Sequence, residues 1–510
     1  MKTTDKYRQD PFFNQKRRLG FALTYEDLSL KTGYSEHLPT DLDVRSRFTT
    51  RVPLNIPLVA SPMDTVTGFR LAISLATDGG IGIIDKSLSP ENQAAVVSRV
   101  KSHLHILIKS PVFVRDNMKL SEVIELREKM KQEDDLDFYS FPVLSAGGKL
   151  VGSIGRSTFD FSGDKISLPI KKIMSRELIT GRPGTTIKQA YAKMIKYGVK
   201  MLPIVNSGGE LKGMYTLKDA KRLLFGNSGS NNVDAGGNLR VGAAVSVCPE
   251  DLEERLDRLS RLGIDVIVID TAHGDSKNVM EAVKYCLKYY PDIDIMAGNV
   301  SEPESVKRLI RAGVHGVRVG QGGGSICTTR KIAGIGCPQG TAVHECAKAA
   351  RGSDVPICAD GGIVYSGHIT IALALGASSV MLGKLFAGVT ESLGKLVDIK
   401  GVEYKTYRGM GSLGAMKDYQ SSRERYGQGK VKIQKLVPEG IEGFVLHQGP
   451  AADQIIQLVG GLRSGMGYVG AKDILTLQRK ARFHHISVAG VREGHPHDIL
   501  LLEGAPNYHV

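Results

Sequence analysis

The sequence predicts an α/β protein built on a TIM (β/α)8 barrel, with a second domain inserted between barrel strands 2 and 3. Three observations lead to this prediction: short apolar runs alternate with helical stretches, the alternation stops near residue 104, and it resumes after about residue 226. Strands of parallel sheets are buried on both faces, so they read as short apolar runs. A chain of 510 residues also exceeds what one hydrophobic core usually organises.

Eight apolar runs can be counted as barrel strands. IPLVASPMDTV and GGIGIID precede the interruption, whereas VGAAVSV, VIVID, DIMAGN, GVRVG, PICADGG and SVMLG follow it. Small or polar residues gather where these runs end: Ser61, Asp64, Asp270, Asn299, Cys327, Asp360 and Gly383. Barrel enzymes place their sites at the carboxyl ends of the strands, so we expect these residues to share one rim.

The interruption contains an internal repeat. FPVLSAGGKLVG recurs 61 positions later as LPIVNSGGELKG, and each copy ends in a hydroxyl residue followed three places on by an aspartate: Ser157 with Asp160, and Thr216 with Asp219. The two copies resemble a tandem CBS (Bateman) domain, a module that commonly binds adenine or guanine nucleotides. The resemblance implies that these four residues contact ribose and phosphates. Alternatively they only cap the helices that follow, and the pair binds nothing.

The stretch VGQGGGSICTTRKIAGIGCPQGTAV, residues 319–343, has the composition of a reactive loop. Its glycines allow backbone amides to approach a ligand closely. Ser325 offers a hydroxyl to a phosphate oxygen, and the Cys327 thiolate would be a nucleophile favoured by the nearby cations Arg330 and Lys331. The alternative is a flexible loop that carries a cysteine by chance.

Composition narrows the functional class. The net charge of +14 is spread along the chain, and small anionic ligands such as nucleotides explain it as well as nucleic acid does. No basic stretch is interleaved with aromatic residues, so we do not expect nucleic-acid binding as the main function. No apolar run approaches the roughly 18 residues of a membrane span, and the first twenty residues lack the apolar core of a signal peptide. The six cysteines lie between Cys248 and Cys358 without a CxxC pair, so we expect reduced thiols and a cytoplasmic location.

The segment after the last barrel strand is too long for one closing helix. It contains YRGMGSLGAMKDYQSSRERYGQGK, rich in glycine and charge, followed by LVPEGIEG. Long loops over a barrel mouth usually act as lids, so we expect a mobile flap at about residues 404–443.

The motifs SPMDTV, DTAHG, GSICTTR, ADGGI, YRGMGSLGAM, RY and VPEGIEG, in this order and with the insertion, resemble the inosine 5′-monophosphate (IMP) dehydrogenase family over nearly the whole chain. The resemblance implies a barrel at residues 1–103 and 227–510 and a tandem CBS domain at 104–226. It implies NAD-dependent oxidation of IMP to xanthosine 5′-monophosphate (XMP), the committed step of guanine nucleotide synthesis. Cys327 would attack C2 of the purine and form a covalent thioimidate, which water then hydrolyses.

The resemblance also implies roles for the flap. Arg425 and Tyr426 match the family's dyad proposed to activate water after the flap enters the vacated dinucleotide site. Because guanidinium is normally protonated, Arg425 would act either as the base, or by stabilising the transition state or anchoring the adduct. Thr329 would orient the purine or relay a proton.

The remaining implied sites follow by position. Substrate contacts are expected at Ser61, Met63, Ser325, Asp360, Gly362, Gly383, Lys384, Tyr407, Gly409, Met410, Gly411 and Glu439. Contacts to NAD are expected at Asp270, Thr271, Ala272, Asn299 and Gly320, although Asp270 could instead be a structural strand-end residue. Potassium is expected on carbonyls of Gly322, Gly324 and Cys327, and of Glu493, Gly494 and His495 from a neighbouring subunit. The family forms square tetramers, so we expect a homotetramer, with an octamer left open.

Four departures from the family pattern stand out. The loop reads QGGG where IGPG or SGSG is more common, Asp85 replaces a histidine, and Gly427 replaces an aromatic residue. Lys384 replaces a phosphate-binding serine, so it either pairs with the phosphate or displaces the usual contact.

Two alternative functions stay open from sequence. GMP reductase, which shares the barrel and the cysteine loop, would convert GMP to IMP with NADPH. A catalytically silent nucleotide sensor would use only the CBS pair. Arg425, Tyr426 and VPEGIEG favour the dehydrogenase over the reductase, and the intact Cys327 argues against the sensor.

Overall fold

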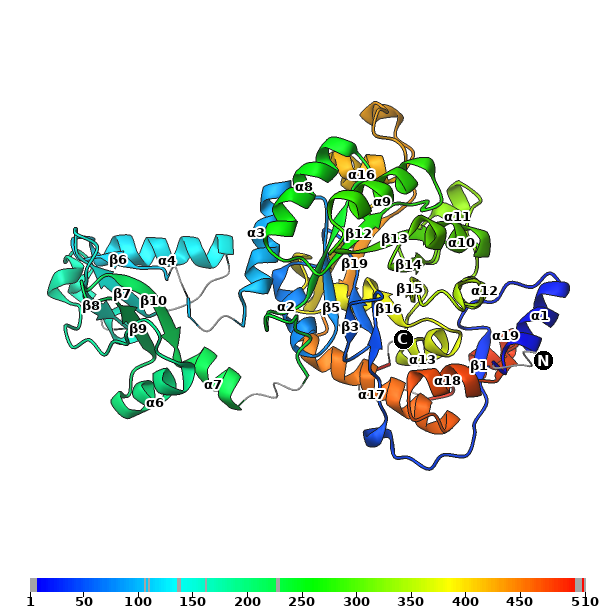
Figure 1. Cartoon of the computed structure of the whole chain (residues 1–510), viewed down its shortest axis with the longest axis horizontal. Coiled ribbons are helices and arrows are strands. Elements are labelled where there is room, and N and C mark those ends of the chain that lie inside the picture. The colour runs from blue at the N-terminus through cyan, green and yellow to red at the C-terminus, as the bar shows by residue number, and fades with distance from the viewer. Residues whose placement is uncertain are drawn as a thin grey trace. The chain divides into compact units, whose positions relative to one another are not determined.

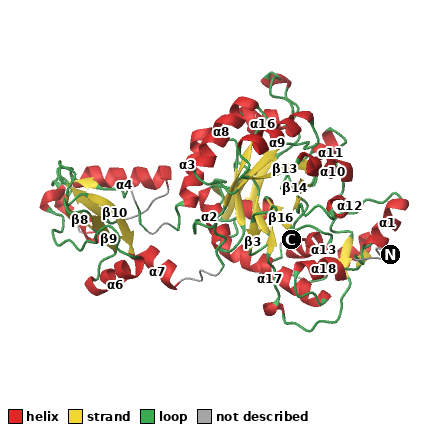
Figure 2. Ribbon diagram, viewed as in Figure 1, coloured by secondary structure: helices red, strands yellow, loops and turns green. Residues whose placement is uncertain are grey.

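The computed structural model describes residues 7–104, 107–108, 111–134, 139–160, 163–225, 230–499 and 507–508. The chain forms two compact units, one of residues Met1–Ser102 with Ser230–Val510 and the other of residues His103–Gly229 (Figures 1 and 2). The predicted boundary at residues 226–227 lies outside the described residues. No helix of the described ranges is both long and apolar enough to span a membrane.

The first unit is a closed barrel of eight parallel strands, which confirms the strand count predicted from sequence. The strands are β4 (Leu58–Ala60), β5 (Ile81–Ile84), β11 (Val241–Val245), β12 (Val266–Asp270), β13 (Asp294–Val300), β14 (Gly316–Val319), β15 (Ile357–Asp360) and β16 (Ser379–Leu382). Val59 of β4 pairs with both Ile81 of β5 and Met381 of β16, which closes the ring. The second unit, His103–Gly229, is inserted in the chain between β5 and β11.

The barrel interior is filled by apolar side chains. Val59, Ile81, Val268 and Met296 belong to one buried cluster that also includes Phe48. The hairpin of β2 (Ser46–Arg47) and β3 (Pro53–Leu54) supplies residues to the same cluster, so it plugs the amino-terminal end of the barrel. The opposite end is left for the polar residues that follow the strands.

Helices surround the sheet (Figure 2). They follow the strands in the order of a (β/α)8 fold, as α2 (Phe69–Thr77), α3 (Pro90–Lys101), α8 (Pro249–Arg261), α9 (Lys277–Tyr289), α10 (Pro303–Ala312), α12 (Gln339–Ala350), α13 (Ser366–Ala374) and α17 (Ala451–Val469). Helix α8 shows why such helices pack against the barrel. Its residues Leu252, Leu256 and Leu259 recur at helical spacing and form one buried apolar face. The unit also contains α1 (Asp10–Arg18), β1 (Leu28–Leu30), α11 (Thr329–Ile332), α14 (Lys384–Ala387), α18 (Ile474–Lys480), β20 (Phe483–His485) and α19 (Val488–Glu493).

The predicted flap connects two neighbouring strands of a small antiparallel sheet. This sheet has the order β17 (Leu396–Ile399), β18 (Val402–Arg408) and β19 (Glu442–Leu446). Between β18 and β19 the chain forms α15 (Leu413–Asp418), α16 (Gln420–Arg425) and a 3-10 turn at Ile433–Lys435. We call residues 409–441 the flap.

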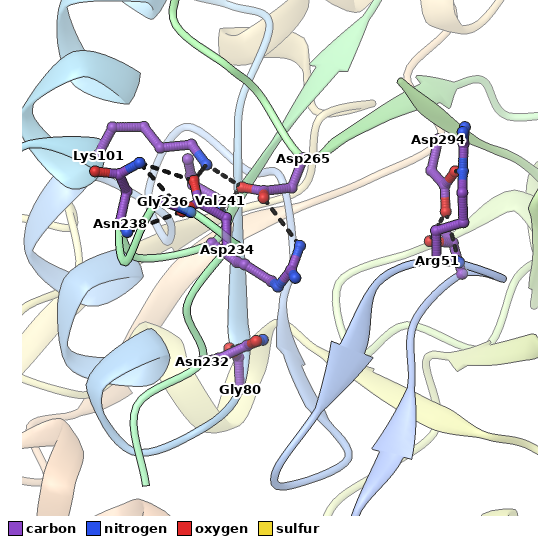
Figure 3. A network of polar contacts seen from close by, with 12 residues as sticks. Arg51, Gly80, Lys101, Asn232, Asp234, Gly236, Asn238, Val241, Asp265 and Asp294 are labelled. Carbon is purple, nitrogen blue, oxygen red and sulfur yellow. Dashed lines mark hydrogen bonds and ion pairs between the residues drawn. The ribbon is translucent and has the colours of Figure 1, made fainter. Parts of the chain in front are cut away.

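Where the chain leaves and re-enters the barrel, a polar network holds the two connections together (Figure 3). Lys101, the last residue of α3, lies 3.0 Å from Asp234 and 2.6 Å from Asp265. Arg240 lies 3.1 Å from Asp265, and Asn238 donates to Asp234. The network therefore anchors the barrel on both sides of the inserted unit.

The inserted unit has two cores, one for each sequence copy. The first copy contributes β6 (Val114–Arg115), α4 (Leu120–Asp134), β7 (Phe141–Leu144), β8 (Leu150–Ile154) and α5 (Arg156–Asp160). The second contributes α6 (Ile187–Tyr197), β9 (Met201–Val205), β10 (Leu211–Thr216) and α7 (Leu217–Phe225). The Thr216 hydroxyl donates to the Asp219 carboxylate at 2.5 Å and accepts from the Asp219 N–H at 3.1 Å. These contacts are those of a helix cap, the alternative left open from sequence.

Candidate active site

A cavity of about 220 Å³ opens at the carboxyl ends of the barrel strands. Its lining combines the loop after β14, the ends of β4, β15 and β16, and parts of the flap. The sequence-predicted residues that line it are Ser61, Met63, Ala272, Asn299, Gly320, Gly322, Gly324, Ser325, Cys327, Thr329, Asp360, Gly362, Gly383, Lys384, Tyr407, Gly409, Met410, Arg425, Tyr426 and Glu439. The structure therefore brings together residues that are up to several hundred positions apart in sequence.

Other predicted residues lie outside this lining. Those of the barrel unit are Asp270, Thr271, Gly411, Glu493, Gly494 and His495, and those of the inserted unit are Ser157, Asp160, Thr216 and Asp219. Asp270 is buried below the cavity, and the Thr271 hydroxyl donates to the carbonyl of Gly298 at 2.8 Å. The His495 ring nitrogen lies 2.8 Å from the Tyr508 hydroxyl.

Cys327 lies half-buried in the loop between β14 and α11. Its thiol donates to the Thr329 hydroxyl oxygen at 3.2 Å, which orients the sulfur. The flap holds the loop, because the Thr328 N–H donates to the Glu439 carbonyl at 2.9 Å and Cys327 forms a backbone bridge with Gly440.

Neither of the two cations that follow Cys327, which were expected beside the thiol, is among the residues that line the cavity. The Arg330 guanidinium donates to the carbonyl of Cys337, and Lys331 is exposed. Proximity along the chain was a poor guide here, because the turn into α11 directs these side chains elsewhere.

The floor of the cavity is a buried cluster of charges. Arg318, on strand β14 and 2% exposed, lies 2.8 Å from Asp270 and 3.0 Å from Asp360. Arg425 of the flap also pairs with Asp270. Lys86 is 3% exposed and donates to the Asp270 carbonyl at 2.5 Å. Asp270 therefore stands among three cationic side chains.

Burial shifts the ionisation of this cluster. The pKa of Lys86 is lowered to about 7, first because burial disfavours the charged ammonium and then because Arg425 and Arg318 repel it. Burial likewise raises the pKa of the neighbouring Asp85. A lysine that loses its proton near neutrality can relieve the excess positive charge beneath the cavity.

The flap is seated on the strand ends. The Ala272 N–H donates to the Arg425 carbonyl at 3.2 Å, next to the ion pair between the Arg425 and Asp270 side chains. Tyr426 packs against Gly411, where a Cβ atom would lie 2.6 Å from the tyrosine ring, so glycine is needed there. Burial raises the pKa of the Tyr426 hydroxyl. The structure thus shows the flap closed over the barrel mouth.

The opposite wall has close backbone packing. Gly320 has φ +150°, and a Cβ there would lie 1.9 Å from the Asp360 carbonyl oxygen. Asn299 donates to the Gly320 carbonyl and to the Asp360 carboxylate, both at 2.7 Å. Gln339 donates to the Val319 carbonyl at 2.8 Å and to the Asp360 carbonyl at 3.0 Å. These amides fix the position of the Asp360 carboxylate at the rim.

Sequence reasoning missed several residues of this site. Lys86, Arg318, Gln321 and Gln339 all contact residues of the cavity wall or its floor. A signal existed for Arg318, because a charge within the buried strand GVRVG requires a buried partner. The sequence alone could not assign Lys86, Gln321 and Gln339 to the site, because their contacts depend on which loops meet in the fold.

The chain matches the family model described as "IMP dehydrogenase / GMP reductase domain" over residues 22–497. The chain belongs to this family. It is 47% identical to an inosine-5′-monophosphate dehydrogenase of Aquifex aeolicus over 498 residues, covering 97% of this chain and 99% of the relative. It is 42% identical to that of Bacillus subtilis over 493 residues, covering 96% and 98%.

A solved structure of a family member has the same fold. It is a cysteine variant of GMP reductase from Trypanosoma brucei in complex with guanosine 5′-monophosphate, with a TM-score of 0.82 and 34% identity. The match covers 96% of this chain and 100% of that chain. The family thus contains two activities, and the near full-length relatives at 47% and 42% identity are both named as the dehydrogenase.

Proposed function

We propose that this chain is an NAD-dependent dehydrogenase that oxidises IMP to XMP. The observation that carries the proposal is that Cys327 and the flap pair Arg425–Tyr426 line one cavity. A nucleophile on one wall and a flap side chain on the other suit a reaction in which a covalent adduct forms and is then hydrolysed. The near full-length dehydrogenase relatives support the same activity.

In the first half-reaction the Cys327 sulfur bonds to C2 of the purine. The C2–H bond breaks with both electrons, so the base is oxidised and a thioimidate remains on the sulfur. NAD, when bound, accepts this hydride. Thr329, 3.2 Å from the sulfur, is placed to relay the thiol proton onward through its hydroxyl or to orient the base.

The barrel rim has a free acceptor for the dinucleotide. Asn299 lines the cavity, and its buried Oδ1 atom has no hydrogen-bond partner among the described residues. A buried acceptor of this kind suits an amide or hydroxyl donor of a bound ligand. Ala272 and Gly320 line the same side of the cavity, so the residues present fit the nicotinamide end of NAD.

In the second half-reaction a water oxygen bonds to C2 and the C2–S bond breaks, which releases XMP and regenerates Cys327. The Arg425 side chain reaches the site from the closed flap and is held by Asp270. A carboxylate partner favours the charged guanidinium. This contact supports a role in stabilising the developing negative charge over a role as the base.

Substrate recognition is proposed around the rest of the cavity. Asp360, fixed by Arg318 and Asn299, would accept from the ribose hydroxyls. The 5′-phosphate would lie among residues of the strand ends that line the cavity: Ser325, Gly362, Gly383, Lys384 and Tyr407. The base would meet Ser61, Met63, Gly409, Met410, Gly411 and Glu439.

Further expectations stay proposals. The inserted unit would be a tandem CBS domain that takes adenine or guanine nucleotides, although the Thr216–Asp219 cap already uses two of its expected contacts. Potassium would bind to loop carbonyls shared between subunits of a homotetramer, with association into octamers left open. Each of these features is proposed from the family resemblance alone.

One pair of assays separates the candidate functions. IMP with NAD is expected to produce NADH and XMP, whereas GMP with NADPH is expected to leave the reductant unconsumed. Consumption of NADPH with GMP alone would make the chain a GMP reductase. Tight ATP or GTP binding with both assays flat would make it a nucleotide sensor.

A further inference from the structure

The side chain of Gln321 connects three strand ends at the barrel mouth. Gln321 lies two residues after the end of β14. Its Nε2 donates to the Ala272 carbonyl beyond β12 at 2.9 Å, and its Oε1 accepts from the Ser301 hydroxyl beyond β13 at 2.7 Å. The residue lines the cavity, beside Ala272 and Asn299. It is also the residue that makes the cysteine loop read QGGG.

These contacts require an amide in one orientation. The Ala272 carbonyl can only accept, so the NH2 group must face it, and Oε1 is then left for the Ser301 hydroxyl. His273 Nδ1 lies 3.4 Å from the same Nε2 atom, where it can accept the second N–H. An aliphatic side chain of similar size would leave the buried Ser301 hydroxyl without this partner.

The residue that Gln321 holds is also the one that receives the flap. The Ala272 N–H donates to the Arg425 carbonyl at 3.2 Å, while the Ala272 carbonyl accepts from Gln321. The two contacts act on opposite sides of one loop residue. Only the φ and ψ torsions of Ala272 separate the two groups, so holding the carbonyl restricts the directions that the N–H can take when the flap closes on it.

We propose that Gln321 is a positioning residue for flap closure in the hydrolytic half-reaction. It acts through Ala272 and takes no part in bond making. The inference rests on the proposed function, in which the closed flap and the dinucleotide occupy the same site in turn. Loss of the amide contacts should then weaken the closed flap relative to the dinucleotide-bound state.

This role predicts slower hydrolysis of the Cys327 adduct together with stronger inhibition by NADH. Hydrolysis of the Cys327 adduct should slow by about three- to tenfold, the range expected for one or two neutral hydrogen bonds. Inhibition by NADH should become at least about twofold stronger, because a weaker flap competes less with the dinucleotide. General damage to the site would weaken NADH binding instead.

The test compares the full-length protein with Gln321→Met and Gln321→Glu. Methionine keeps the volume without the amide, and glutamate keeps the acceptor for Ser301 but loses the donor to Ala272. Gln457→Met on helix α17 is the matched control. Rapid mixing of IMP and NAD gives the rate of the NADH burst and the steady-state rate, and added NADH gives its inhibition constant.

We expect both Gln321 variants to keep the burst rate within about twofold of the wild type, with slower steady-state turnover and tighter NADH inhibition. A slower burst with unchanged turnover, or weaker NADH inhibition, would overturn the proposal, as would variants that behave like Gln457→Met. Absence of NADH formation by the wild type would instead refute the proposed function. The two failures are therefore distinguishable.

Discussion

Substitution of Asp270 by asparagine tests the charge cluster beneath the cavity. The change keeps the size of the side chain and removes only its negative charge. In the wild type, this carboxylate lies 2.8 Å from Arg318, 3.9 Å from Lys86 and in an ion pair with Arg425 of the flap. The variant leaves these cations facing one another in a buried site.

The expected loss of stability can be bounded from these contacts. Removing one partner of a buried ion pair costs about 3–5 kcal/mol. Two features favour the lower end: Arg318 keeps Asp360 at 3.0 Å, and Lys86 can release its proton because its pKa is about 7. We therefore expect Asp270→Asn to lower the free energy of unfolding by about 3 kcal/mol near neutral pH.

The control is Asp275→Asn, five residues further along. Asp275 is 12% exposed, pairs with Arg308, whose side chain is 49% exposed, and accepts from the Ser305 hydroxyl, so its loss should cost about 1–2 kcal/mol. Urea unfolding followed by circular dichroism measures both variants against the wild type. Equal destabilisation by the two substitutions would refute the account of a buried charge cluster.

Three further variants probe the site. Arg425→Ala should slow adduct hydrolysis about a hundredfold while the NADH burst persists. Intact mass spectrometry should then find modified Cys327, whereas loss of the burst would place Arg425 in the first half-reaction. Lys86 has a folded pKa of about 7, below that of the unfolded chain, so the unfolded state binds more protons above pH 7. The free energy of unfolding of the wild type, relative to that of Lys86→Met, should thus rise by about 2 kcal/mol between about pH 7 and pH 9. Urea titrations measure this difference, and a difference that does not change with pH would contradict the lowered pKa of Lys86. Lys384→Ser should raise the KM for IMP about fivefold at low salt and less at high salt, and an unchanged KM would exclude a phosphate contact.

The barrel could be predicted because a strand that is buried on both faces appears in the sequence as a short continuous apolar run. VIVID and GVRVG read as strands on their own, and the insertion could be located because the alternation stopped. The glycine-rich loop of the candidate site was also visible, since glycine, Ser325 and Cys327 occur together. These features depend on neighbouring residues and need no knowledge of distant contacts.

No local sequence pattern predicts the charge cluster or the amide contacts. Lys86, Asp270 and Arg425 meet only when two strand ends and the flap converge. The direction of a side chain also escaped prediction: Arg330 follows Cys327 closely but donates to the Cys337 carbonyl. Nucleotide binding by the insertion, potassium and the tetramer remain predictions from the family resemblance.

Transfer of the C2 hydrogen from IMP to NAD is the step that distinguishes covalent oxidation at Cys327 from other routes to NADH. IMP carrying deuterium at C2 is mixed with NAD and the full-length protein, and the reaction is quenched during the first turnover. We expect deuterium in the NADH and a purine adduct without deuterium on Cys327, with both signals absent in Cys327→Ala. Unlabelled NADH, or labelled NADH formed by Cys327→Ala at the wild-type rate, would contradict covalent oxidation at this cysteine.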